Sequence, residues 1–140
     1  MDHKSISNKI DHYKFRNDRV IETRLKTERR HLTILAVYGL TEGRDELNEE
    51  FYETLQKILD KVNRNDCIML IGDTNVRVGN NGVDNIVGRN GEATLNSDGR
   101  TSTDCCTFNS LKIINTFLST KKFINLLVKQ DGTNQLWIAL

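Results

Sequence analysis

The sequence predicts an α/β fold, and three features of the chain lead to that prediction. Residues 67–71 are five consecutive apolar residues, which is typical of a strand buried on both faces. An amphipathic helix is predicted before it, beginning near Asp45, and two strand-like segments at 20–27 and 32–38 precede the helix and are predicted to form a hairpin. The order strand, helix, strand permits a right-handed crossover between neighbouring strands.

Length and composition indicate one globular domain. The chain has 140 residues, of which 37% are hydrophobic and 28% charged, and this balance excludes an intrinsically disordered protein. The net charge of +1 gives no overall field that would attract nucleic acid or a membrane. No segment approaches the roughly 20 apolar residues of a membrane span, and the N-terminus lacks the apolar run of a signal peptide.

The three cysteines predict reduced thiols. Cys105 and Cys106 are adjacent, a spacing that rarely permits a disulfide between them, and no C-x-x-C spacing suggests zinc. Each cysteine is most simply a small apolar residue. We therefore expect an intracellular protein, nuclear or cytoplasmic, with no disulfide-linked partner.

Alternation and periodicity place the first elements. In residues 20–27 the even and odd positions differ in character, which predicts a half-exposed strand, with Ile21, Thr23, Leu25 and Thr27 on one face. In the helix, Asp45 is the expected N-cap. The helical stripe predicted to face the core comprises Leu47, Phe51, Leu55, Ile58, Leu59 and Val62.

The remaining segments give weaker patterns. Residues 1–18 are polar and predict no regular element, and the Gly/Asn/Asp-rich residues 79–100 predict a long mobile surface loop, or one that flanks a substrate. A short helix is expected over 101–110, with Cys105 and Phe108 facing inward, and a strand over 112–117. Residues 126–128 and 136–138 are predicted to form a last hairpin.

The candidate chemistry lies where the apolar strand ends. Asp73 and Asn75 are two residues apart, so they can project in the same direction from the carboxyl end of the strand, where ligands of open α/β sheets bind. A P-loop partner motif is absent, an EF-hand would require different residues at Arg77 and Val78, and no histidine is tied to a nucleophile. Two readings remain: a turn capped by its own side chains, or a pair that holds water or a hard cation against a phosphate.

Several segments resemble the endonuclease/exonuclease/phosphatase superfamily, which includes abasic-site endonucleases, DNase I-like nucleases and the endonucleases of LINE retrotransposons. The likeness lies in residues 24–30, 32–38, 51–53, 59–63, 71–79 and 111–117. Its most specific part is Gly72-Asp73-Thr74-Asn75, a G-D-x-N motif that follows a strand ending in Tyr38. Within the superfamily the sequence looks most like retrotransposon-derived and craniofacial development protein 2-like endonuclease sequences.

The resemblance implies a magnesium-dependent phosphodiesterase acting on DNA or RNA. Asp73 would orient or deprotonate the attacking water and contribute to binding Mg²⁺. Asn75 would position Asp73 and the phosphate, and Tyr38 would contact the scissile phosphate. Taken alone, Tyr38 is more simply a half-buried packing residue. Arg29, Arg30, Lys121 and Lys122 are further candidates for phosphate contacts, although surface solubility explains them equally well.

Four departures from the superfamily pattern indicate an incomplete domain. Gly39-Leu40 stands where the superfamily usually has Ala-Pro, and residues 1–19 contain no candidate for its metal-binding glutamate. Residues 134–138 lack the expected aspartate, and the chain ends at Leu140 before an Asp-His pair. We therefore expect a polar segment over 1–18 and an incomplete domain over 19–140. Its predicted fold is part of a DNase I-like four-layer α/β sandwich, with mixed, mostly antiparallel sheets and flanking helices.

These departures leave the question of enzymatic activity open. We expect a fragment of a nuclease-like hydrolase whose activity is weak or absent in the chain as it stands. The alternatives are a non-catalytic remnant of a retrotransposon and a phosphatase of the same superfamily.

Overall fold

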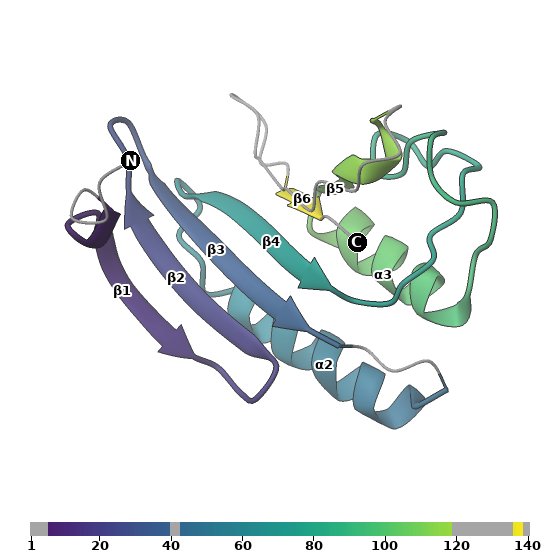
Figure 1. The fold of residues 1–140 in the computed structure, drawn as a ribbon, viewed down its shortest axis with the longest axis horizontal. Helices are drawn as coiled ribbons and strands as arrows, with labels where there is room; N and C mark the ends of the chain where they lie inside the picture. The colour runs from purple at the N-terminus through teal and green to yellow at the C-terminus, as the bar shows by residue number, and fades with distance from the viewer. Residues whose placement is uncertain (1–5, 40–42, 119–135, 139–140) are drawn as a thin grey trace.

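The predicted α/β class is confirmed by a computed structural model that describes residues 6–39, 43–118 and 136–138 (Figure 1). Its elements, in chain order, are β1 (Ile10–Phe15), β2 (Val20–Lys26), β3 (His31–Tyr38), α2 (Asp45–Leu59), β4 (Cys67–Asp73), α3 (Ser97–Phe108), β5 (Leu111–Ile113), the 3₁₀ turn η1 (Ile114–Thr116) and β6 (Leu136–Ile138). The predicted hairpin, the first helix and the strand after it are all present.

The strands form one mixed sheet in the order β1-β2-β3-β4-β6-β5. Within the described residues, β1–β2 and β2–β3 pair antiparallel, whereas β3–β4, β4–β6 and β5–β6 pair parallel. The expected mostly antiparallel pairing is therefore wrong for this sheet. The parallel β3–β4 pair follows from the helix between them, because a parallel neighbour requires a crossover connection.

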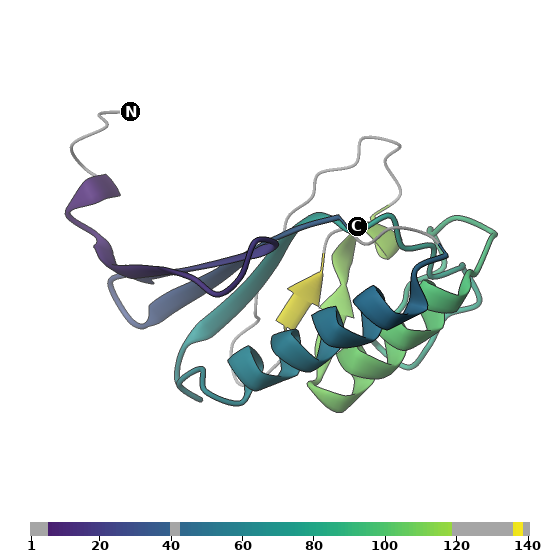
Figure 2. The same cartoon turned by 90° about the horizontal axis from the view of Figure 1, so that it is seen from below.

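Both helices lie on the same face of the sheet (Figure 2). On β3, the side chains of Thr33, Leu35 and Val37 point toward this helical layer and are buried. Most of the predicted stripe on α2 faces the same core, which includes Phe51, Leu55, Ile58, Leu59, Val20, Leu70, Cys106, Leu111 and Ile113. No helix in the described part of the chain has the length and apolar character needed to cross a membrane.

The N-terminal strand β1 corrects the expectation that residues 1–18 lack regular structure. Phe15 pairs with Ile21 and Tyr13 with Thr23 in an antiparallel ladder, with an irregularity near Ile10. Most residues of β1 are exposed. The strand is therefore held by backbone hydrogen bonds and polar contacts to β2 rather than by burial, which explains why hydrophobic patterning does not reveal it.

The first turn of α2 differs from the prediction by one residue. The N-cap is Arg44, which makes no capping hydrogen bond through its side chain, and Asp45 is the first helical residue. An acidic residue there still interacts favourably with the helix dipole. Leu47, expected in the core, is partly exposed, and Val62 lies beyond the end of the helix.

Residues 79–100, expected to be a surface loop throughout, form a loop that is anchored to the core and ends where α3 begins at Ser97, and its expected mobility stays a prediction. The side chain of Val87 is buried, its backbone bridges to Ile113, and the Gly88 N–H donates to the Thr116 hydroxyl at 2.7 Å. The helix begins at Ser97 because the side chain of Asn96 caps it. Apolar residues such as Val87 hold the loop against the core. The many glycines and asparagines of the segment made this packing hard to predict from the sequence.

Helix α3 and the strand after it also differ in detail. Cys106 is fully buried and behaves as a small apolar residue, as expected, and burial raises the pKa of the Cys105 thiol to about 11. Phe108, expected to face inward, is 78% exposed. The strand expected over 112–117 is only Leu111–Ile113, followed by η1. Leu136–Ile138 is a strand, and its expected partner at 126–128 lies outside the described residues.

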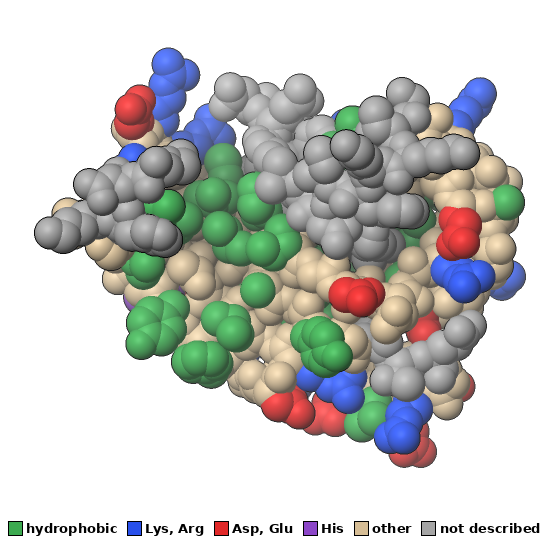
Figure 3. Space-filling view, viewed as in Figure 1, with side chains coloured by type: hydrophobic (Ala, Val, Ile, Leu, Met, Phe, Trp, Pro, Cys, Tyr) green, Lys and Arg blue, Asp and Glu red, His purple; other side chains and the backbone are tan. Residues whose placement is uncertain are grey.

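The second face of the sheet carries apolar side chains that remain accessible. The strand registers place Tyr13, Phe15, Ile21, Ile34 and Ile71 on this open face, opposite the helices. Phe15 is 72% exposed and Tyr13 64%. Hydrophobic side chains gather over this part of the molecule in the space-filling view (Figure 3). The described residues thus form two layers, and the four-layer sandwich stays a prediction.

Candidate active site

The candidate site lies at the carboxyl ends of β3 and β4. Tyr38 and Asp73 are the last residues of these strands and are register partners in the parallel ladder. The ladder continues one step further, because the Gly39 N–H donates to the Asp73 carbonyl oxygen at 2.8 Å. Register partners project from the same face of a sheet, about 4.8 Å apart. A phenol and a carboxylate therefore stand side by side, and both residues are exposed.

The residue before Asp73 must be glycine for the strands to approach this closely. Gly72 pairs with Val37 and has a φ of 151°, and a Cβ at this position would lie 1.8 Å from the Val37 carbonyl oxygen. No side chain can occupy that space without moving the backbone of β3 or β4. The first residue of the G-D-x-N motif is thus a packing requirement of the sheet, and it fixes how Asp73 leaves the strand.

Asn75 is coupled to Asp73 through the backbone. The strand ends at Asp73, and Asn75 adopts a left-handed conformation with a φ of 51°. The Asn75 N–H donates to Asp73 Oδ1 at 3.3 Å, which closes a turn around the carboxylate. The strand alternation expected to point both side chains the same way stops before Asn75. The turn instead orients the Asp73 carboxylate.

The segment after the motif is anchored to the start of α3. Asn96 Oδ1 accepts hydrogen bonds from the Arg77 N–H at 3.2 Å and from the Gly99 N–H at 2.8 Å, and the Asn96 N–H donates to the Arg77 carbonyl oxygen at 3.0 Å. One side chain therefore caps the helix and holds the backbone two residues beyond Asn75. This anchor limits how far the turn at Asp73 can move.

A buried polar contact joins the first turns of the two helices behind the site. Asn48 Nδ2 donates to Asp98 Oδ1 at 2.9 Å, and both residues are buried. Burial raises the pKa of the nearby Tyr52 phenol, whose hydroxyl donates to the Asp98 carbonyl oxygen at 3.4 Å. Because buried polar groups are costly to leave unpaired, this contact fixes the position of α3 relative to α2.

An ion pair and a hydrogen bond made by Asp66 hold the amino-terminal end of β4 against β2 and β3. Asp66 accepts hydrogen bonds from Arg24 Nε at 2.7 Å, from Arg24 Nη2 at 2.9 Å and from the Thr33 hydroxyl at 3.0 Å. Burial opposes ionisation of Asp66, but these hydrogen bonds outweigh it and hold the pKa of this carboxyl below its usual value. The contact pins the residue just before β4 to β2 and β3.

One arginine at the site was not among the sequence candidates. The Tyr38 N–H donates to the Arg19 carbonyl oxygen at 3.0 Å, one step beyond the Val20–Val37 pair of the hairpin, and Arg19 Nη1 donates to the Gly39 carbonyl oxygen at 2.6 Å. Arg19 therefore stands beside Tyr38 on the open face. The sequence predicts this hairpin without its register, so no sequence signal placed residue 19 opposite Tyr38.

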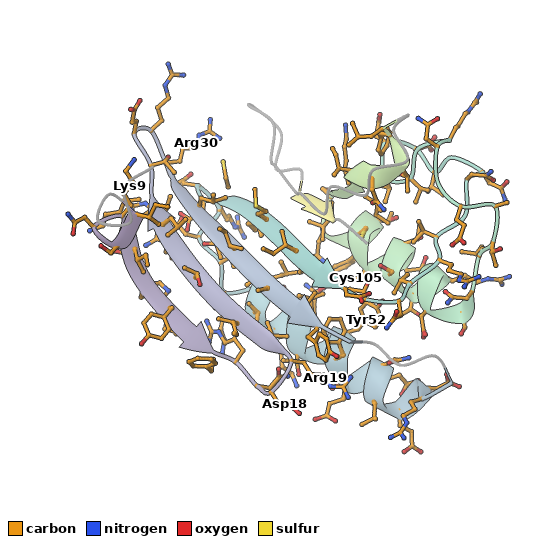
Figure 4. All side chains as sticks on the ribbon, in the orientation of Figure 1. Lys9, Asp18, Arg19, Arg30, Tyr52 and Cys105 are labelled. Atoms are coloured by element: carbon orange, nitrogen blue, oxygen red, sulfur yellow. The ribbon has the colours of Figure 1, made fainter. Side chains whose placement is uncertain are left out.

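The arginines proposed from the sequence lie elsewhere. Arg29 and Arg30 occupy the turn that joins β2 to β3, at the opposite end of the hairpin from Arg19 (Figure 4). The eight residues of β3 separate that turn from Tyr38, a distance of about 25 Å. Neither side chain can reach a phosphate held at Tyr38 and Asp73. Lys121 and Lys122 lie outside the described residues.

The oxygen donors at the site set what it can bind. Mg²⁺ is typically bound by one or two carboxylates together with substrate phosphates and water. Asp73 is the carboxylate at this edge, and no group of three or more His, Cys, Asp or Glu side chains suited to a metal occurs among the residues that the structure describes. The donors fit Mg²⁺ only when substrate phosphate oxygens complete the ligand set.

Comparison with known proteins relates the chain to one group of vertebrate sequences. It is 35% identical over 114 residues to Craniofacial development protein 2 from Tragulus javanicus, which covers 81% of this chain and 20% of that protein. Craniofacial development protein 2 from Bos taurus matches at the same 35% identity over 114 residues, covering 81% of this chain and 19% of that protein. The chain thus spans about a fifth of the length of these relatives. No family model matches it.

Proposed function

We propose that this chain carries part of the active site of an endonuclease/exonuclease/phosphatase-type domain that hydrolyses nucleic acid phosphodiesters. The observation that supports it is the pairing of Tyr38 with Asp73 at the carboxyl ends of two parallel strands. The G-D-x-N motif and the homology to Craniofacial development protein 2 over most of the chain are consistent with this assignment. Activity of the chain by itself is expected to be weak.

In this proposal the two side chains act on opposite parts of the reacting group. The Asp73 carboxylate, oriented by the Asn75 N–H, holds a water and accepts its proton as the water oxygen bonds to phosphorus. The Tyr38 hydroxyl donates a hydrogen bond to a non-bridging phosphate oxygen, where negative charge builds up. The phosphorus–oxygen bond to the leaving sugar oxygen then breaks, and this oxygen takes a proton from solvent water.

Mg²⁺ is the cofactor that the site would accept. Asp73 would hold it jointly with the substrate phosphate, and the ion would neutralise phosphate charge. The exposed position of Asp73 leaves room for the waters that Mg²⁺ retains.

A substrate panel tests the assignment. The purified chain is incubated with Mg²⁺ and, in separate reactions, with supercoiled plasmid, single-stranded RNA and a phosphomonoester. Nicking of plasmid or cleavage of RNA that stops with EDTA is expected. Release of inorganic phosphate from the monoester alone would instead support a phosphatase.

A non-catalytic remnant is the second candidate. The departures from the superfamily pattern favour it, because residues 1–19 hold no glutamate that could serve as the further metal ligand of superfamily-type hydrolysis. A chain that binds nucleic acid but leaves every substrate of the panel intact, at enzyme concentrations equal to substrate, would support the remnant over the hydrolase.

A further inference from the structure

A row of three side chains crosses the open face of the sheet at its carboxyl edge. Tyr38 is the register partner of Asp73 on one side and is hydrogen-bonded through its backbone to Arg19 on the other. Tyr38 and Asp73 are ladder partners about 5 Å apart, and the Arg19 guanidinium reaches the carbonyl oxygen of Gly39, the residue after Tyr38, so the three groups follow in the order guanidinium, phenol, carboxylate along this edge. This edge therefore offers a cation, a hydrogen-bond donor and a carboxylate side by side.

The partners of Arg19 differ from those of Arg16 and Arg24, two other arginines near β2. Arg16 pairs with Glu22, and Arg24 pairs with Asp66 and Asp11, so the charges of both are neutralised on the helical side of β2. Within the described part of the chain, Arg19 makes no ion pair. Its described side-chain hydrogen bond is to a neutral carbonyl group, that of Gly39.

The hydrogen bond to Gly39 orients the Arg19 guanidinium and uses only part of its donor capacity. A guanidinium has five N–H donors in a rigid fork, and the bond from Nη1 to Gly39 uses one of them. Arg19 is also only partly exposed, which reduces the side-chain entropy that it would lose on binding an anion. The residue is therefore a pre-positioned cation with donors remaining for phosphate oxygens.

A positively charged side chain at the site would offset the repulsion between Asp73 and a bound phosphate. The carboxylate of Asp73 repels the phosphate that it is proposed to act on, and the phenol of Tyr38 carries no compensating charge. A cation in the same row offsets that repulsion before Mg²⁺ is bound. Arg19 forms the positive end of the row, which attracts the sugar–phosphate backbone of a nucleic acid, and Asp73 forms the negative end, which faces the reacting phosphate.

We infer that Arg19 binds the phosphodiester backbone of the nucleic acid substrate and positions the scissile phosphate over Tyr38 and Asp73. This rests on the proposed function for the class of substrate. Arg19 acts through binding, so its contribution is present without metal and without hydrolysis. Removing it weakens affinity and lowers the salt dependence of binding by about one counterion.

Binding measured in EDTA separates this role from catalysis. Fluorescence anisotropy of a labelled DNA duplex is followed over a range of NaCl concentrations for the wild type, Arg19→Gln and the matched control Arg29→Gln. Arg19→Gln is expected to weaken binding about tenfold and to reduce the slope of log affinity against log salt by about one. Arg29→Gln, which removes the same charge from the far turn, is expected to change affinity less than twofold. Equal effects of the two variants, or no binding by the wild type, would overturn the inference.

A measurement on the wild type covers the case in which Arg19→Gln does not fold. Phenylglyoxal modifies accessible arginines, and mass spectrometry reports which ones react with and without the duplex. Protection of Arg19 but not Arg29 supports the inference, and unprotected Arg19 contradicts it. Failure of hydrolysis with binding and protection intact would remove the proposed function alone.

Discussion

Tyr38 and Asp73 are register partners at the ends of adjacent parallel strands, and the Gly39 N–H extends their ladder by a 2.8 Å hydrogen bond to the Asp73 carbonyl oxygen. Because side chains alternate along a strand, a slip of one residue would turn Asp73 toward the helices and away from Tyr38. The candidate site therefore depends on the register of β4, which Gly72 and Asp66 fix at its two ends.

The role of the Tyr38 hydroxyl can be tested without disturbing the fold. Tyr38 is 74% exposed, so Tyr38→Phe should leave the melting temperature unchanged while lowering Mg²⁺-dependent nicking by about 100-fold, the loss typical of a donor to developing negative charge. The measurement is a single-turnover nicking assay. The control is Tyr13→Phe, at a position of β1 that lies on the same face of the sheet as Tyr38, and this variant should retain full activity. Equal rates for Tyr38→Phe and Tyr13→Phe would remove Tyr38 from the site.

The close approach of β4 to β3 predicts a large cost for a methyl group at Gly72. Gly72→Ala should lower the free energy of unfolding by about 3 kcal/mol or more, because the new Cβ collides with the Val37 carbonyl oxygen. Gly43→Ala is the control: its φ of 81° is also unfavourable for alanine, but nothing lies within 4 Å of a Cβ there. That variant should cost about 1 kcal/mol. Similar urea denaturation midpoints for the two variants would contradict the predicted collision.

Acid should weaken the contact between Asp66 and Arg24. The pKa of Asp66 is lower in the folded protein than its usual 3.8, so its stabilisation is fully present above that value and is lost as the pH falls through the folded pKa. Asp66→Asn should cost about 3 kcal/mol at neutral pH and flatten the decline in stability below about pH 4. Thermal melts across this pH range measure both effects.

The control for that experiment is Asp104→Asn, an exposed position on α3. It should reproduce the stability and pH profile of the wild type. A profile of Asp66→Asn that falls as steeply in acid as that of the wild type would show that another carboxyl group is responsible.

The open face of the sheet should promote association. Phe15→Thr combined with Tyr13→Thr removes two exposed aromatic rings and replaces them with β-branched side chains, which also favour a strand. We expect lower light scattering and weaker binding of a hydrophobic dye, with a melting temperature close to that of the wild type. Leu35→Ala, in the opposite core, should instead cost about 2–5 kcal/mol. Unchanged scattering in the double variant would mean that this face does not drive association.

The sequence was most informative where apolar residues recur with a clear period. The apolar run of β3 and the stripe through Phe51 and Leu55 on α2 lie where predicted, because burial of one face selects the period. β2 alternates as predicted, but its apolar face with Ile21 lies on the open side of the sheet, and the buried residues are Val20 and Glu22. β1 was missed because backbone pairing and charged contacts hold it. Phe108 was misplaced because a helix only twelve residues long carries too few apolar residues to define its buried face.

The site was predicted in part for the same reason. Tyr38 and Asp73 end recognisable strands, so their proximity follows from a parallel β3–β4 pair. The turn at Asn75 depends on a positive φ, which alternation does not indicate. Arg19 joins the site only through the exact pairing of β2 with β3, and pairing of that kind is a property of the folded sheet. The roles of Asp73, Asn75 and Tyr38 in catalysis stay predictions.

The rate of Mg²⁺-dependent plasmid nicking by Asp73→Asn tests most directly whether the Asp73 carboxylate acts on the attacking water. The substitution keeps the shape of the side chain and an oxygen that can accept the Asn75 N–H, but it removes the charge and the proton acceptor. Asp104→Asn, which removes one carboxylate from the surface of α3, is the matched control. We predict that Asp104→Asn nicks at the wild-type rate and that Asp73→Asn loses Mg²⁺-dependent nicking. Equal nicking by all three proteins would contradict it.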